Sequence, residues 1–459
     1  MGARTFLRNS AANGRTCGVL SRADNDVLTR TGAGTPMGRL FRRFWLPALL
    51  SAEVPEPDGP PVRVRILGED LVAFRDTGGR VGLIEPACPH RGANLFFGRN
   101  EEGGIRCMFH GWKFDATGTC LAMPNSPPDA TYERLRAQMT IVAYPTVEFG
   151  DMIWAYMGPG EPPPFPRMEF GLAPPARRFA SKKLQQCNYA QALEGALDTA
   201  HFTFLHTSVG EHNAATAMAN SEAGASGDAE RVRWLREDGM PRFSAIEHDA
   251  GVALGAARKA DPGRLYWRIS QYLLPNHTLV PSTFPGENYH GQTFVPIDDE
   301  SCWIYCFTYN PERDLGTAER ERYRNGHTIY AAVDAQYVPI RRRENDYLID
   351  RDKQKHTSFT GIDGVSEQDA AAQDSQGYIA DRTREHLTVT DVGVTQFRKL
   401  ILGAARALER GEVPAAAGRP DAYCIRGGGW VAPAAMPFED VMIERFGNAI
   451  GLVQSVNAG

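Results

Sequence analysis

The chain has 459 residues, of which 42% are hydrophobic and 23% charged, so it is long enough for two or three domains with sizeable cores. Its 50 basic and 55 acidic residues give a formal net charge of −5, which offers no sign of a nucleic-acid or membrane-surface partner. No apolar run approaches the ~18 residues of a spanning helix, and eight cysteines without a regular spacing are typical of a reduced, cytoplasmic protein.

The N-terminal segment 1–23 contains four arginines and no acidic residue, and it lacks the long apolar core of a secretory signal. We expect a disordered arm there. From Val62 to Gly158, short apolar runs alternate with hairpin signals at Gly78-Gly79, Gly103-Gly104 and Asp115–Gly118. This pattern predicts a small antiparallel β domain.

A proline-rich segment, 157–170, cannot continue a strand or a helix, so we expect the domain boundary there. The remaining chain changes character several times. Its pattern predicts a helix over 187–206, an Ala/Gly/Ser-rich loop over 213–230 and strands from 240 to 310. A charged irregular stretch follows over 341–361, and then a long helix over about 376–410 with at most one break.

Four metal-binding side chains lie in two short loops of 88–114, "CPHRGANLFFGRNEEGGIRCMFHGWKF". The first loop supplies Cys88 and His90, and the second supplies Cys107 and His110. Structural zinc usually takes two cysteines from one loop and two histidines from the other, so this division suits two metal atoms better. Two thiolates on one iron and two imidazoles on the other describe a [2Fe–2S] centre of raised reduction potential. Zinc is the competing interpretation.

The spacing Cys-x-His, sixteen residues, Cys-x-x-His, ending in "HGWKF", closely resembles the Rieske motif. Cys120 lies nearby but outside both loops, and we expect it in the core rather than among the ligands.

A second group occurs in 188–206, "NYAQALEGALDTAHFTFLH". Glu194, Asp198 and His201 share one face of a helix, but His206 would lie about 140° away from His201. We therefore expect the helix to widen or end between 201 and 206, so that both histidines reach one metal. The plainer alternative is an amphipathic helix with two hydrogen-bonded histidines.

Two histidines and one carboxylate with open positions are typical of a non-heme Fe(II) oxygenase. The carboxylate must come from elsewhere in the chain. The segment 361–387 offers Asp363, Asp369 and Asp374, and no spacing argument chooses among them.

With both motifs present, the chain resembles the α subunits of Rieske non-heme iron ring-hydroxylating oxygenases from about Asp24 to the C-terminus. It is most similar to the phthalate dioxygenase and phenoxybenzoate dioxygenase branch. That likeness is carried by long stretches such as "GTPMGRLFRRFWLPALL" and "SQGYIADRTREHLTVTD".

The resemblance implies an α+β fold: an all-β Rieske domain over 24–160, then a helix-grip catalytic domain over 161–459 with an antiparallel sheet and a long C-terminal helix. It also implies roles for individual residues. Cys88, Cys107, His90 and His110 would hold the [2Fe–2S] cluster; His201, His206 and Asp369 would hold a mononuclear Fe(II); Asp198 would connect an iron-ligating histidine to His110 of a neighbouring subunit; and Asn188 would lie near the iron.

The same resemblance implies an oxygenase component that receives electrons from a separate flavin and iron–sulfur reductase. It would use O2 to hydroxylate an aromatic, carboxylated substrate, with cis-dihydroxylation favoured. Packing of subunits head to tail in a ring would give a trimer or a pair of stacked trimers. A buried carboxylate needs a cationic partner, and Arg258, in "GAARK", is our candidate for it.

Three alternatives stay open. A Rieske monooxygenase that performs O-demethylation, ether cleavage or a single hydroxylation would use the same ligands. A Rieske electron carrier without oxygenase activity would not need the second motif, and a helix-grip binding protein without iron would not keep His201, His206 and Asp369.

Overall fold

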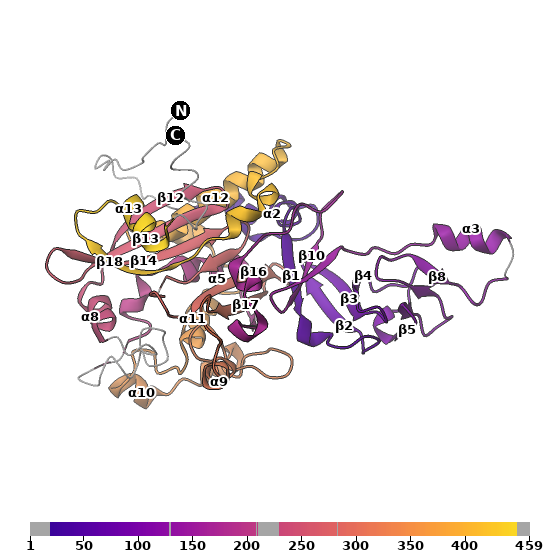
Figure 1. The fold of residues 1–459 in the computed structure, drawn as a ribbon, viewed down its shortest axis with the longest axis horizontal. Coiled ribbons are helices and arrows are strands. Elements are labelled where there is room, and N and C mark those ends of the chain that lie inside the picture. The colour runs from indigo at the N-terminus through magenta and orange to yellow at the C-terminus, as the bar shows by residue number, and fades with distance from the viewer. Residues whose placement is uncertain (1–18, 128–129, 208, 210–228, 282, 448–459) are drawn as a thin grey trace.

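A small domain of short strands projects from a larger domain of helices and a broad sheet (Figure 1). The computed structural model describes residues 19–127, 130–207, 209, 229–281 and 283–447. The predicted α+β architecture, with an all-β domain first and a catalytic domain of sheet and helices second, is confirmed.

The small domain contains three antiparallel sheets with the orders β1-β10-β9, β2-β3-β4 and β5-β6-β7-β8. The three hairpin signals join β3 to β4, β5 to β6 and β7 to β8, as the sequence predicted. The strands are β1 Trp45–Leu50, β2 Val62–Ile66, β3 Glu69–Arg75, β4 Val81–Ile84, β5 Arg99–Glu101, β6 Gly104–Arg106, β7 Lys113–Phe114, β8 Cys120–Ala122, β9 Thr146–Phe149 and β10 Met152–Tyr156, with helix α3 at Ala130–Gln138.

The large domain is built on an antiparallel sheet with the order β11-β17-β16-β15-β14-β13-β12, and β18 pairs with β14. β13 and β14 are buried along almost their whole length, because other elements cover both faces of the sheet there. The strands are β11 Arg178–Gln185, β12 Arg242–His248, β13 Gly251–Lys259, β14 Arg264–Leu273, β15 His277–Leu279, β16 Tyr289–Pro296, β17 Cys302–Tyr309 and β18 Gly428–Pro433.

Helices pack on this sheet as the helix-grip expectation requires. α5 contacts β15 and β16, α11 contacts α5, and the long α12 contacts β13 and α5. Within the residues that the structure describes, the helices of the domain are α4 Glu169–Leu172, α5 Tyr189–Leu197, α8 Ala229–Glu237, α9 Thr317–Arg324, α10 Arg351–His356, α11 Val365–Asp374, α12 Val392–Glu409 and α13 Phe438–Phe446.

The first two helices, α1 (Arg22–Thr29) and α2 (Pro36–Phe41), pack on α12, although the sequence placed residues 24–160 in the small domain. α2 begins at Pro36, after the Thr35 hydroxyl caps the Gly38 amide. The described part of the chain therefore begins on the large domain, passes through the small one and returns. Of the expected arm 1–23, residues 1–18 lie outside the described residues, and Arg22 already begins α1.

The expected helix over 376–410 is wrong in its first half. α12 starts only at Val392, and 376–391 contains a single short turn at Arg382–Arg384. Side-chain ion pairs hold this segment instead: Arg382 pairs with Glu194 of α5, and Glu385 pairs with Arg398 of α12. The loop expected at 213–230 lies mostly outside the described residues, and α8 already includes its last two.

No helix in the described part of the chain is both long enough and apolar enough to span a bilayer.

Candidate metal centres and cavity

The helix that leads to the two histidines ends before it reaches them. α5 stops at Leu197, and Asp198 follows in an extended conformation. The Asp198 carboxylate accepts a hydrogen bond from the Ala200 amide at 2.7 Å and starts the tight turn His201–Thr203. As a result, the rings of His201 and His206 lie 5.0 Å apart, centre to centre. The helix was expected to widen or end between 201 and 206, but it ends earlier, at Leu197, so neither histidine lies on it and a short turn brings the two rings together.

Asp369, on α11, meets both histidines. Its Oδ1 lies 3.2 Å from His206 Nε2 and 3.6 Å from His201 Nε2. Both Nε2 atoms are buried and make no hydrogen bond. Among the described residues, this is the one group of three or more His, Cys, Asp or Glu side chains whose ligand atoms all lie within 4.8 Å of one another. The donor set and its orphaned nitrogens fit a divalent metal such as iron.

The other two carboxylates that the sequence left open are occupied elsewhere. Asp363 pairs with Lys353 at 2.9 Å. Asp374 accepts hydrogen bonds from the Tyr347 hydroxyl and from Gln185. Of the three candidates, only Asp369 therefore approaches the histidines.

Each histidine is held by a different partner on its other nitrogen. His201 Nδ1 lies 3.4 Å from Asp198 Oδ2, and His206 Nδ1 lies 2.7 Å from Gln368 Oε1. The Gln368 amide donates to the Ile362 carbonyl at 2.8 Å, so its oxygen faces His206 and can only accept. Both rings therefore carry their proton on Nδ1 and present Nε2 to a metal.

The Asp369 carboxylate is ionised in this setting. Burial opposes its ionisation, but the neighbouring His206 and His201 outweigh burial and hold the pKa of Asp369 below its usual value. A charged oxygen therefore faces the two Nε2 atoms, and a bound cation would take the place of their protons.

The four Cys/His residues of the small domain lie on two loops with the same backbone pattern. The Cys88 amide donates to Ala93 and its carbonyl accepts from Gly92; Cys107 does the same with Trp112 and Gly111. Both glycines have positive φ, at +73° and +74°, which closes each turn. The cysteines are buried and the histidines partly exposed, with their rings 4.4 Å apart.

This arrangement does not suit one zinc ion. A tetrahedral zinc site brings ligand atoms to about 4 Å of one another, yet no three of these four residues have ligand atoms within 4.8 Å. Two buried thiols on one side and two imidazoles on the other fit a two-iron cluster, and His110 Nδ1 is buried without a hydrogen-bond partner.

Two families match the chain, "Rieske [2Fe-2S] domain" over residues 44–140 and "LigXa C-terminal domain like" over residues 155–424. The oxygenase subunit of phthalate 4,5-dioxygenase from Pseudomonas putida is 37% identical over 410 residues, which cover 86% of this chain and 88% of that protein. The oxygenase subunit of 3-chlorobenzoate-3,4-dioxygenase from Comamonas testosteroni is 35% identical over 440 residues, covering 92% and 98%.

The chain belongs to the Rieske non-heme iron oxygenases.

A solved structure of dicamba monooxygenase bound to dicamba shares the fold, with a TM-score of 0.53 and 19% identity over 81% of this chain and 98% of that one. The Rieske oxygenase described here is accordingly an oxidoreductase, with a [2Fe–2S] domain and a domain whose relatives carry a mononuclear iron site.

A cavity of the Rieske oxygenase lies between the inner face of the sheet and the helices α5 and α11. His201, Phe202 and Asp369 form one wall, and Arg268 of β14 and Lys183 of β11 also line it. The floor between the two cations is mostly apolar and includes Val280, Phe294, Ile304 and Ile329.

Arg268 is the cavity residue that the sequence analysis missed. It is 1% exposed, its Nε donates to the Thr199 hydroxyl at 3.0 Å, and its guanidinium lies 4.2 Å from the centre of the Phe202 ring. Its Nη2 is buried without a partner. The alternation of apolar and polar residues along β14 did not single out Arg268, because sequence alone does not distinguish a buried arginine from a solvated one.

Arg258, the predicted substrate ligand, lies on the neighbouring strand and is not among the cavity-lining residues described. It donates to the carbonyls of Thr199 and Asp238, at 2.7 and 3.2 Å. Burial, followed by the charge of Arg268, lowers the pKa of Arg258 to about 10. Arg258 therefore supports the wall behind Arg268 and adds positive charge to it.

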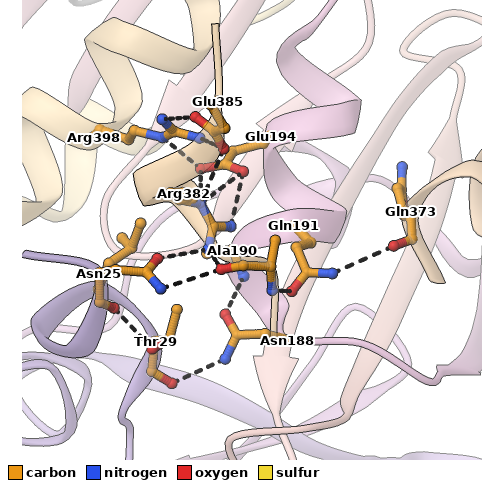
Figure 2. A network of polar contacts seen from close by, with 12 residues as sticks. Asn25, Thr29, Asn188, Ala190, Gln191, Glu194, Gln373, Arg382, Glu385 and Arg398 are labelled. Carbon is orange, nitrogen blue, oxygen red and sulfur yellow. Dashed lines mark hydrogen bonds and ion pairs between the residues drawn. The ribbon is translucent and has the colours of Figure 1, made fainter. Parts of the chain in front are cut away.

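Asn188, predicted to lie beside the iron, caps α5 instead. Its Oδ1 accepts from the Ala190 amide, and its Nδ2 donates to the Thr29 carbonyl (Figure 2). The Nδ2 group also donates to the Asp299 carbonyl at 2.7 Å. The hydrogen-bonding groups of its side chain are therefore used by this cap, by α1 and by the segment before β17. A neighbouring network joins Glu194 of α5 to Arg382 and Arg398.

Proposed function

We propose that this Rieske oxygenase hydroxylates an aromatic carboxylate whose anionic group binds Arg268. One observation carries the proposal: the guanidinium lines the cavity beside His201, is buried, and keeps an unpaired Nη2. A buried guanidinium without an acid partner is costly, and a substrate carboxylate would pair with it. The apolar floor would hold the ring.

We assign Cys88, Cys107, His90 and His110 to the [2Fe–2S] cluster, and His201, His206 and Asp369 to the iron. When bound, the cluster supplies single electrons and the ferrous ion activates O2. Asp198 and Gln368 keep the Nδ1 protons of His201 and His206 in place, so the imidazoles stay oriented toward the metal.

Electrons would come from a separate flavin and iron–sulfur reductase. Within one chain the two centres lie on different domains, so we propose a ring of subunits, a trimer or a pair of trimers, in which His110 of one subunit meets Asp198 of the next. The side chain of Asp198 is 27% exposed, which leaves its carboxylate accessible to such a neighbour. The described cysteines are all free, in keeping with a cytoplasmic location.

We favour cis-dihydroxylation, since the two relatives described above are named dioxygenases. Monooxygenation, by ether cleavage, O-demethylation or a single hydroxylation, is the second candidate, and the monooxygenase that shares the fold supports it. An electron carrier without oxygenase activity is disfavoured by the convergence of His201, His206 and Asp369.

Incubation with a reductase, a panel of aromatic acids and labelled O2 tests the proposal. Two labelled oxygens in the product indicate dioxygenation and one indicates monooxygenation. Arg268→Met should raise KM for carboxylates about ten-fold or more, as expected for loss of a charged hydrogen bond. An unchanged KM for every acid in the panel would refute the role of Arg268.

A further inference from the structure

Lys183 is a second buried cation of the cavity, at the far side from Arg268. It is 4% exposed, and its ammonium donates to the Ser366 hydroxyl at 2.6 Å and to the Ser366 carbonyl at 3.2 Å. No carboxylate of the described residues lies within ion-pair distance of it. An ammonium has three N–H groups, so one remains available to a molecule in the cavity.

The sheet order separates the two cations. Lys183 projects from β11 and Arg268 from β14, and β17, β16 and β15 lie between these strands. Four strand spacings correspond to about 19 Å along the sheet, so the two side chains enter the cavity from opposite sides. Phe294 and Ile304 lie on the strands between them and give the middle of the floor its apolar character.

The two cations of the cavity are not paired with its acidic side chains. Its two acidic side chains, Asp198 and Asp369, are both engaged by the histidines. Lys183 and Arg268 lack such a partner, and burying an unpaired cation is costly. An anion at Arg268 compensates only one of them.

We propose that Lys183 binds a second oxygen-bearing substituent of the substrate, and that the enzyme therefore selects aromatic acids with a further carboxylate in the meta or para position. This inference rests on the proposed function, because it assumes that the first carboxylate pairs with Arg268. Neighbouring ortho groups cannot reach both ends of the floor, whereas meta and para groups point in diverging directions.

The test compares Lys183→Met with wild type on benzoate, phthalate, isophthalate and terephthalate, by KM and by calorimetric Kd for each acid. Methionine keeps the shape of the side chain and removes only its charge. Binding of isophthalate or terephthalate should weaken about ten-fold or more, as expected for a charged hydrogen bond, while benzoate changes less than about three-fold. Equal losses for all four acids, or no loss for any, would overturn the inference.

Lys182→Met is the matched control. Lys182 is equally buried but lies on the opposite face of β11, where it pairs with Glu53 at 2.7 Å outside the cavity. It should leave the ratio of benzoate to terephthalate affinity unchanged.

Arg268→Met separates the two proposals, because it should weaken the binding of all four acids. If it weakens none while Lys183→Met is selective, the proposed carboxylate site fails and the Lys183 contact stands.

Discussion

His206 Nδ1 lies 2.7 Å from Gln368 Oε1, and this amide is the neutral counterpart of the Asp198 carboxylate that holds His201. Gln368 precedes Asp369 on α11, so one turn of helix supplies both a metal-facing oxygen and the acceptor that orients a histidine. The two histidines are therefore supported by groups of different charge.

Gln368→Leu should lower iron affinity about 10- to 100-fold, as removal of the partner of a ligating histidine commonly does. The [2Fe–2S] content should not change, because Gln368 lies in the other domain. Iron analysis and the visible spectrum of the cluster measure the two quantities separately. Gln368→Glu keeps an acceptor for His206 and should recover part of the affinity; if the leucine variant binds iron normally, the amide has no such role.

Asp198→Ala should keep iron and cluster bound yet reduce turnover at least 100-fold, because the proposed bridge between subunits is lost. The direct measurement is the oxidation rate of the reduced cluster in the presence of substrate and O2. Near-normal activity of this variant would show that electrons do not pass through Asp198.

Glu194→Gln should destabilise the protein by about 3–5 kcal/mol, since it leaves Arg382 and Arg398 buried with reduced pairing. A thermal or denaturant melt measures the loss, and an unchanged melting temperature would contradict it. As a control, Lys399→Met removes an exposed pair with Glu247 and should lower the free energy of unfolding by at most about 1 kcal/mol.

The same network predicts a pH dependence. Burial opposes the ionisation of Glu194, but Arg382 and Arg398 outweigh it and hold its pKa below the usual value. A lowered pKa stabilises the fold above the unfolded pKa of about 4.3, and this stabilisation is lost as pH falls further through the folded pKa. Wild type should therefore lose more stability than Glu194→Gln when pH drops from 5 toward 3, which parallel melts can compare.

Asn188→Ala should lower stability by at least about 1 kcal/mol through loss of the cap and of two buried hydrogen bonds. Substrate KM and iron content should change little in the fraction that stays folded. If the variant were fully stable but had lost turnover selectively, Asn188 would have a role in the reaction rather than in the fold.

The side chains that we assign to the two metal centres could be proposed from sequence because their types and spacings are local. The two Cys/His loops and the pair His201 and His206 each lie within about 30 residues, and the geometry of a helix already required a break between the histidines. The third carboxylate could not be chosen from the sequence, because Asp363 precedes α11 while Asp369 and Asp374 lie on it, and only the packing of α11 on α5 brings Asp369 to the histidines.

The residues around the metal site depend on contacts between distant strands. Arg258 and Arg268 are ten residues apart on adjacent strands, and only the pairing of β13 with β14 decides which one lines the cavity. Asn188 was misplaced for a similar reason, because its partners lie on α1 and before β17. The prediction of a helix over 376–391 was wrong because the conformation of this segment depends on the pairing of Arg382 with Glu194, which is far away in sequence.

The place where the chain leaves and re-enters the large domain has a further consequence. β1 and β10 are antiparallel neighbours, with Trp45 opposite Tyr156, so the small domain is attached through two adjacent strands rather than a single tether. Such a double hinge resists swinging and fixes how far the cluster stands from the rest of its own subunit. The segment between these strands is also tied to the catalytic sheet, because Glu53 pairs with Lys182 of β11 and the Leu67 amide donates to the Pro296 carbonyl of β16. A graft of this segment between homologues would therefore have to carry both sides of these contacts.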